Sequence, residues 1–150
     1  MKNVLLRDLA ALVARVAVGV IFIAHGWQKL TEWGLDGTAA AFDQMGVPLP
    51  TASAWFAALV ELVGGVALLV GLVVPVAGLL LALNMLGAFL IVHLSNGVFV
   101  NDNGFELVLA LGAAALLLAA VGAGRFSLDR LIAPRLSRRA DRQAPRTAAA

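Results

Sequence analysis

Residues 52–74 read ASAWFAALVELVGGVALLVGLVV, an apolar run interrupted by a single charged side chain, Glu61. A helix needs about 20 apolar residues to cross a hydrocarbon core about 30 Å thick, so this run has the length of a membrane span. A charge at the bilayer centre costs about 2.5–3.5 kcal/mol on insertion scales. An ionisable residue in such a position indicates a functional site, and Glu61 is the first candidate.

Three further apolar stretches accompany this one. Together with residues 52–74, the runs at 9–30, 76–94 and 104–121 predict four membrane-spanning helices. Hydrophobic residues make up 61% of the chain, against roughly 45–50% in soluble domains. We therefore expect an all-α membrane protein, a four-helix bundle that forms one domain over residues 1–132.

Lysine and arginine gather at the two ends of the chain. Lys2 and Arg7 precede the first stretch, and a series of arginines from Arg125 to Arg146 follows the fourth. The loops 31–51 and 95–103 contain neither residue type. Because cytoplasmic loops carry the excess of lysine and arginine, both termini are predicted to be cytoplasmic. The basic tail, 133–150, is expected to be disordered and to fix this topology at anionic lipid, with a regulatory or partner-binding role as the alternative.

The outer loop 31–51 allows two interpretations. Asp36-Gly37-Thr38 can cap a short surface helix over residues 39–45, which Gly46 and Pro48 then end. An ordinary loop explains the same residues equally well.

Polar side chains interrupt each of the four stretches. They are Arg15, His25, Gln28 and Lys29 in the first, Glu61 in the second, Asn84 and His93 in the third, and Glu106 in the fourth. With spans of alternating direction and a rise of about 1.5 Å per residue, His25, Lys29, Glu61, His93 and Glu106 all fall in the outer half of the membrane. Simple exposure at the water interface is the alternative for His93 and Glu106.

Glu61 needs a partner because apolar residues flank it on both sides. Its carboxyl group is predicted to be protonated, to face water, or to pair with Lys29, His25 or Arg15. Arg15 lies nearer the cytoplasmic side and can also extend toward water there. Lys29 can alternatively extend to the outer headgroups.

The chain contains no cysteine and no tyrosine. The first absence removes disulfides, thiol relays, iron–sulfur ligation and covalent haem attachment from this chain, and the second removes a tyrosyl redox role. No metal site and no nucleic-acid partner are predicted. A haem held by His25 and His93 is disfavoured because the two residues are expected at different depths.

Several short motifs, in order and over residues 7–132, resemble those of the DoxX family. They are RVAVGVIFIAHGWQKL at 15–30, LVELVGG at 59–65, LNM at 83–85, HLSNGVF at 93–99, GFE at 104–106 and GRFSLD at 124–129. The resemblance implies a four-helix protein of the bacterial inner membrane. Members are associated with thiosulfate:quinone oxidoreductase or with membrane oxidoreductase complexes of thiol and oxidative stress, and more distant relatives act as assembly factors.

Two functions of different classes follow. In the first, the chain is a membrane subunit of an oxidoreductase complex that reduces quinone. Its catalytic residues are then Glu61, His25 and Lys29, and its binding residues are Gln28, Asn84, His93 and Glu106. Electrons must come from a redox or sulfur-handling protein partner or a diffusible donor, since the chain has no cysteine. In the second, the chain is a membrane scaffold or assembly factor. A proton-coupled transporter is a third interpretation and requires a homo-oligomer.

Overall fold

In the computed structural model, residues 2–132 are described, and every regular element among them is helical. The elements are α1 (Lys2–Thr31), α2 (Gly34–Gln44), α3 (Pro50–Val70), α4 (Val74–Ala88), the π-helical turn η1 (Phe89–His93), the 3-10 turns η2 (Leu94–Asn96) and η3 (Val100–Asp102), and α5 (Glu106–Val121). The prediction of an all-α fold is confirmed for these residues. The predicted tail, 133–150, lies outside them.

Three helical segments are long and apolar enough to cross a membrane. They are Val4–Thr31, Pro50–Val70 and Val74–Asn96, the last of which runs through α4, η1 and η2. The remaining apolar helix, α5, has 16 residues. It is shorter than the roughly 20 residues of a typical span.

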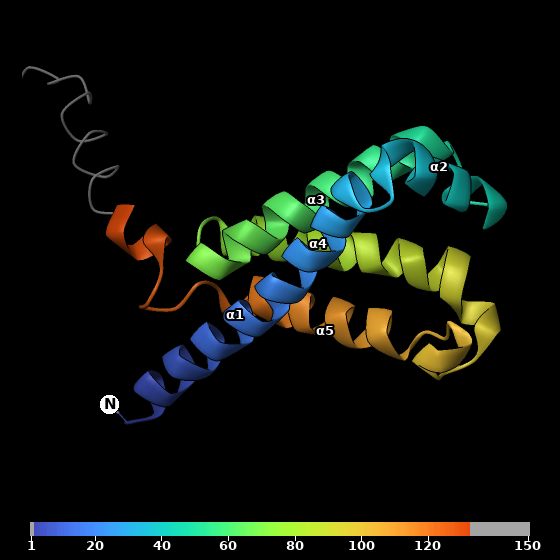
Figure 1. The fold of residues 1–150 in the computed structure, drawn as a ribbon. Helices are drawn as coiled ribbons and strands as arrows, with labels where there is room; N and C mark the ends of the chain where they lie inside the picture. Colours follow the sequence, from blue (N-terminus) through green and yellow to red (C-terminus); the bar gives the residue numbers. More distant parts are fainter. Residues whose placement is uncertain (1, 133–150) are drawn as a thin grey trace, which may run out of the picture.

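The helices form two packed pairs, α1 with α3 and α4 with α5 (Figure 1). A short turn at residues 71–73 joins α3 to α4, and the two helices diverge from this turn (Figure 1). We call this end of the molecule the turn end. The opposite end, called the α2 end, holds α2, the end of α1 and the starts of α3 and α5 (Figure 1).

Glycines let the paired helices touch along their backbones. A Cβ atom at Gly19 would lie 2.8 Å from a carbonyl oxygen of α3, and one at Gly26 would lie 2.5 Å from the backbone nitrogen of Leu62. In the other pair, a Cβ atom at Gly78 would lie 2.6 Å from the carbonyl oxygen of Ala115. Membrane helices associate largely through such close packing, because lipid tails are as apolar as the helices themselves.

Apolar side chains fill the centre of the protein and also cover its outside. Phe22, Leu68 and Leu81 are buried in a core to which α1, α3, α4 and α5 all contribute. Val63 and Leu117 are among many apolar side chains that are more than half exposed. An extensive exposed apolar surface marks a membrane-interacting protein, and here it covers the helices that have the length of spans.

Arg15 lies buried at the turn end. Its side chain is 0% exposed, and its two terminal nitrogens donate hydrogen bonds to the carbonyl oxygens of Leu68, at 3.4 Å, and Phe126, at 2.6 Å. Arg15 is about two helical turns from the level of Glu61 along α3, since it binds at Leu68. Both expectations for Arg15 are therefore wrong, because the side chain neither extends to water nor pairs with Glu61.

The chain that follows α5 is bound to the α3–α4 turn. Gly71 ends α3 with φ +73°, and the absent Cβ leaves the space that the Arg15 guanidinium fills. The Asp129 carboxylate accepts a hydrogen bond of 2.9 Å from the backbone N–H of Val73, and the Asp129 N–H donates to the Gly71 carbonyl oxygen at 3.1 Å. Arg15, Gly71, Phe126 and Asp129 together form what we call the Arg15 latch.

The outer loop contains a helix, as one of the two interpretations predicted, but its start differs. α2 begins at Gly34, and Thr38 lies buried within the helix instead of capping it. The Thr38 hydroxyl is 2.9 Å from the carbonyl oxygen of Gly34 and 3.2 Å from that of Lys29. The contact with Lys29 attaches α2 to the last turn of α1.

The glycine packing leads to a matched pair of stability predictions. Gly26→Val should lower the free energy of unfolding by about 1–3 kcal/mol, because the new side chain collides with the backbone of α3. Gly87→Val is the control, because no atom lies within 4 Å of a Cβ at Gly87. The free energy of unfolding of the two variants is measured in mixed micelles. Equal stability of the two variants would contradict the backbone contact of α1 with α3.

Candidate functional site

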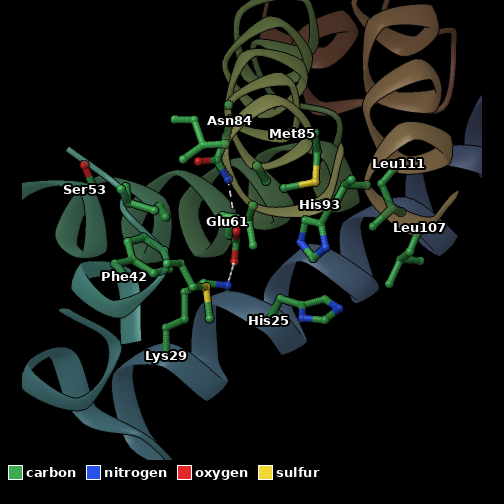
Figure 2. Close-up of a pocket in the computed structure, with 18 of the residues that line it drawn as sticks. His25, Lys29, Phe42, Ser53, Glu61, Asn84, Met85, His93, Leu107 and Leu111 are labelled. Carbon is green, nitrogen blue, oxygen red and sulfur yellow. Dashed lines mark hydrogen bonds and ion pairs between the residues drawn. The ribbon is translucent and has the colours of Figure 1, made fainter. Parts of the chain in front are cut away.

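Glu61 is the centre of a buried polar cluster. The residue is 3% exposed, and its Oε2 atom lies 2.6 Å from Nζ of Lys29. Its Oε1 atom accepts a hydrogen bond of 3.0 Å from Nδ2 of Asn84. Of the partners predicted as possible for Glu61, Lys29 is the one that the structure places in contact with it. Because Lys29 belongs to α1, Glu61 to α3 and Asn84 to α4, one carboxylate links three helices (Figure 2). We call these three residues the Glu61 cluster.

The local sequence explains why each group takes this position. Lys29 lies in the last turn of α1, one turn after His25 on the same helix face. Glu61 lies in the middle of α3 with apolar residues on either side, so its charge must be neutralised by another helix. Attraction between opposite charges is strong where the effective dielectric constant is low, which favours this pair over exposure of either group to lipid.

A cavity of about 490 Å³ adjoins the Glu61 cluster. Its wall comes from α1, α2, α3, α4, η1 and α5, and most of it is apolar. The polar residues in the wall are His25, Gln28, Lys29, Ser53, Glu61, Asn84, His93 and Asn103. Small-molecule sites are usually clefts of about 300–1,000 Å³ with an apolar wall and a few polar groups, and this cavity has both properties.

His25 and His93 lie on the same side of Glu61 and both line the cavity (Figure 2). Nδ1 of His93 is 2.7 Å from the carbonyl oxygen of Asn103, which fixes the orientation of that ring. Two imidazoles therefore border the same space as the ammonium–carboxylate pair. Imidazole, ammonium and carboxylate are the side-chain groups that most often transfer protons in enzymes.

The π-helical turn η1 was not predicted from the sequence. It spans Phe89–His93, and Ile91, Val92 and His93 all line the cavity. One extra residue in a turn rotates the side chains that follow by about 100°, so η1 changes which of them face inward. Such turns occur frequently at functional sites. The sequence FLIVH carries no proline or glycine that would have indicated it.

The other two predicted binding residues have different surroundings. Gln28 lines the cavity, and its Nε2 atom donates to Oε2 of Glu32 at 3.1 Å. Glu106 is exposed and does not line the cavity. Its Oε1 atom accepts a hydrogen bond of 2.8 Å from the backbone N–H of Val100, so it holds the loop before α5. Six of the seven predicted site residues thus meet at the cavity, and Glu106 does not.

Several residues of the wall were missed by the sequence analysis. Phe42 and Met45, from α2 and its C-cap, border the cavity at the α2 end, and Gly87 borders it from α4. Phe42 and Met45 are apolar residues three positions apart, within a segment that the sequence allowed to be either a helix or a loop. This helical spacing was the available sequence signal that they face the same side. Nothing in the sequence separates Gly87 from the glycines that serve helix packing.

The fold and the cavity define a helical membrane protein with a buried ion pair facing a small-molecule-sized space. The family model of DoxX matches residues 10–94. The inner membrane protein YqjF of Escherichia coli (strain K12) is 37% identical over 131 residues, which cover 85% of this chain and 95% of YqjF. A Bacillus subtilis (strain 168) protein named "Putative oxidoreductase CatD" is 34% identical over 122 residues, 81% of this chain and 86% of CatD. The inner membrane protein YphA of Escherichia coli (strain K12) is 32% identical over 129 residues, 83% of this chain and 91% of YphA.

The chain belongs to the DoxX family. It is a multi-pass integral protein of the bacterial inner membrane, as its apolar helices and these relatives together establish. No solved structure matches it.

The ion pair can be tested by a double-mutant cycle. Lys29→Met should lower the free energy of unfolding by about 3–5 kcal/mol, because it leaves a buried carboxylate without its cation. Combining Lys29→Met with Glu61→Gln should restore most of this loss, since the amide keeps a hydrogen bond with Asn84. The free energy of unfolding in mixed micelles is measured for Lys29→Met, for Glu61→Gln and for the double variant. Additive losses in the double variant would show that the two side chains are not coupled.

Proposed function

We propose that this protein is the membrane subunit of an oxidoreductase complex and that the cavity beside the Glu61 cluster binds a quinone. The observation that carries the proposal is an ammonium–carboxylate pair of 2.6 Å at the wall of a mostly apolar cavity between helices that have the length and composition of membrane spans. A quinone has the matching properties, namely a flat apolar ring with two oxygens that accept hydrogen bonds.

The polar residues of the wall have the chemistry that quinone reduction requires. Conversion of a quinone to a quinol adds two electrons and two protons, and the protons go to the two ring oxygens. Lys29 can donate a hydrogen bond to one oxygen, and Glu61 and His25 can hold and pass protons. Asn84 holds the carboxylate in place by its 3.0 Å hydrogen bond.

The electrons must come from a partner or a diffusible donor, because this chain contains no cysteine and no tyrosine. We propose a partner that oxidises thiols or thiosulfate. Oxidation of two thiols to a disulfide releases two electrons and two protons, which balances the reduction of one quinone. The relative named "Putative oxidoreductase CatD" supports oxidoreductase function in general, and the thiol or thiosulfate donor is our own proposal.

We infer further that α5 is a fourth span and that both termini are cytoplasmic. The apolar composition of α5 and its packing beside α4 support the first point. The concentration of lysine and arginine at the two ends of the chain supports the second. In this orientation the cavity lies in the outer half of the membrane.

A scaffold function remains the alternative, and one observation favours it. Both oxygens of Glu61 already have partners, so the cluster can serve to hold α1, α3 and α4 in register. Hydrogen bonds between membrane helices average only about 0.6 kcal/mol, however, so a scaffold gains little from a charged cluster. A scaffold function also gives no reason for the cavity beside the Glu61 cluster.

The orientation can be measured with reporter fusions. A reporter that is active only in the cytoplasm should work when fused after Ala150 and fail when inserted in the 31–51 loop. A reporter that needs export should show the reverse pattern. Export-dependent activity after Ala150 would exclude the proposed topology.

The catalytic and scaffold functions differ in the behaviour of the Lys29→Met and Glu61→Gln double variant. If the Glu61 cluster handles protons, membranes that contain this variant at normal levels should lose quinone reduction driven by the partner. Asp43→Asn is the matched control, because it also changes a carboxylate to an amide, while Asp43 is exposed on α2 and does not line the cavity. Full activity of the double variant would exclude the catalytic role and leave the scaffold.

A further inference from the structure

α3 and α4 are in contact near the turn end and separate toward the α2 end. At the level of Gly64, a Cβ atom would lie 3.0 Å from Cγ of Leu81 on α4, so the two helices touch there. Further along, the hydrogen bond from Asn84 to Glu61 bridges them. Beyond this bridge, a Cβ atom at Gly87 would have no atom within 4 Å. The gap between the helices therefore widens past the Glu61 cluster, in agreement with their divergence in Figure 1.

Three apolar side chains form the edge of the cavity at this gap. They are Phe56 on α3, Leu83 on α4 and Ile91 in η1, and all three line the cavity. These residues are nevertheless 51%, 52% and 44% exposed, respectively. These side chains therefore connect the cavity wall with the outer surface at the gap, and Trp33, Met45, Val100 and Leu107 do so at the α2 end. Leu83 and Gly87 are four residues apart on α4, so they lie on one side of that helix, and Ile91 borders the same cavity from η1. We call Phe56, Leu83, Gly87 and Ile91 together the mouth.

The mouth lies within segments that have the length and composition of membrane spans. Phe56 belongs to Pro50–Val70, and the other three residues belong to Val74–Asn96. Lipid tails surround such segments, so an opening bordered by apolar side chains at this depth meets hydrocarbon rather than water. The polar Glu61 cluster forms the inner part of the same cavity.

We propose that the cavity opens laterally into the bilayer between α3 and α4, and that its ligand is an amphiphile whose head binds at the Glu61 cluster while its apolar tail leaves through the mouth. The gradient from a polar inner wall to an apolar edge matches such a molecule and disfavours a water-soluble one. The mouth itself follows from the geometry alone. The identity of the head as a quinone ring rests on the proposed function.

The first test uses the absence of cysteine, which allows a spin label to be placed at a single position. Gly87→Cys should accept a label that is relaxed by oxygen, which concentrates in lipid, and protected from a water-soluble nickel chelate. Ala113→Cys, exposed on α5, is the lipid-facing control, and Asn101→Cys, exposed in η3, is the aqueous control. A label at Gly87 that the nickel chelate reaches, or that neither reagent reaches, would overturn the lateral opening.

The second test varies the tail of the ligand. Quinones with a decyl tail and with no tail are compared in nanodiscs by quenching of Trp33, which lines the cavity, with Trp27 and Trp55 changed to Phe. Gly87→Leu should weaken binding of the decyl quinone at least about tenfold, or about 1.4 kcal/mol, because the new side chain fills the mouth. Binding of the tail-less quinone should change by less than about twofold, well under 1.4 kcal/mol. Ala113→Leu should change neither.

The outcomes separate this inference from the proposed function. Equal weakening of the two quinones, or no weakening of either, would exclude a tail in the mouth. Failure of both quinones to bind the unaltered protein would contradict the proposed function, and the spin-label experiment would still decide whether the mouth opens to lipid.

Discussion

A carboxylate placed in hydrocarbon needs a cation and hydrogen-bond donors, and this requirement organises the fold. Glu61 obtains its cation, Lys29, from the last turn of α1 at 2.6 Å, and its donor, Asn84, from the C-terminal half of α4 at 3.0 Å. Both distances require α1, α3 and α4 to meet at one level of the bundle. The interhelical glycines make this possible, since Gly19 and Gly26 bring α1 close enough to α3 for the Lys29 side chain to reach across. Packing and electrostatics therefore specify the same arrangement.

The same arrangement explains why a cavity exists beside the cluster. α1 and α3 are held together at the α2 end, and α4 and α5 are held together as a second pair. Only the amide of Asn84 connects the two pairs at the level of Glu61 among the hydrogen bonds of the described residues. Small residues at the wall, such as Ala57 and Gly87, do not fill the space that remains. The polar bridge thus links the two pairs beside a space that these small side chains leave open.

The sequence predicted the parts of this structure that follow from transfer energies. Apolar runs gave the spanning helices, and the high cost of burying Glu61 predicted a partner among the few cations within reach. Two parts depend on three-dimensional packing and could not be predicted in this way. The π-helical turn that brings His93 to the cavity has no sequence signal, and the binding of Arg15 to the Phe126 carbonyl joins residues 111 apart in sequence. Glu106 was predicted as a binding residue of the shared site, but the structure places it elsewhere. Its carboxylate accepts a hydrogen bond from the loop that precedes its own helix.

The Arg15 latch has a consequence for biosynthesis. The Arg15 guanidinium belongs to α1, but one of the two carbonyl oxygens that it binds belongs to Phe126, 111 residues later in the chain. Until Phe126 has been made, the guanidinium therefore lacks one of these two hydrogen-bond partners. The Arg15 latch can be complete only after α5 has been made and the chain that follows α5 has returned to the α3–α4 turn. A nascent chain that ends before Phe126 leaves the buried Arg15 guanidinium with the Leu68 carbonyl oxygen as its remaining acceptor of these two, which makes early release of the chain costly for the packing of α1.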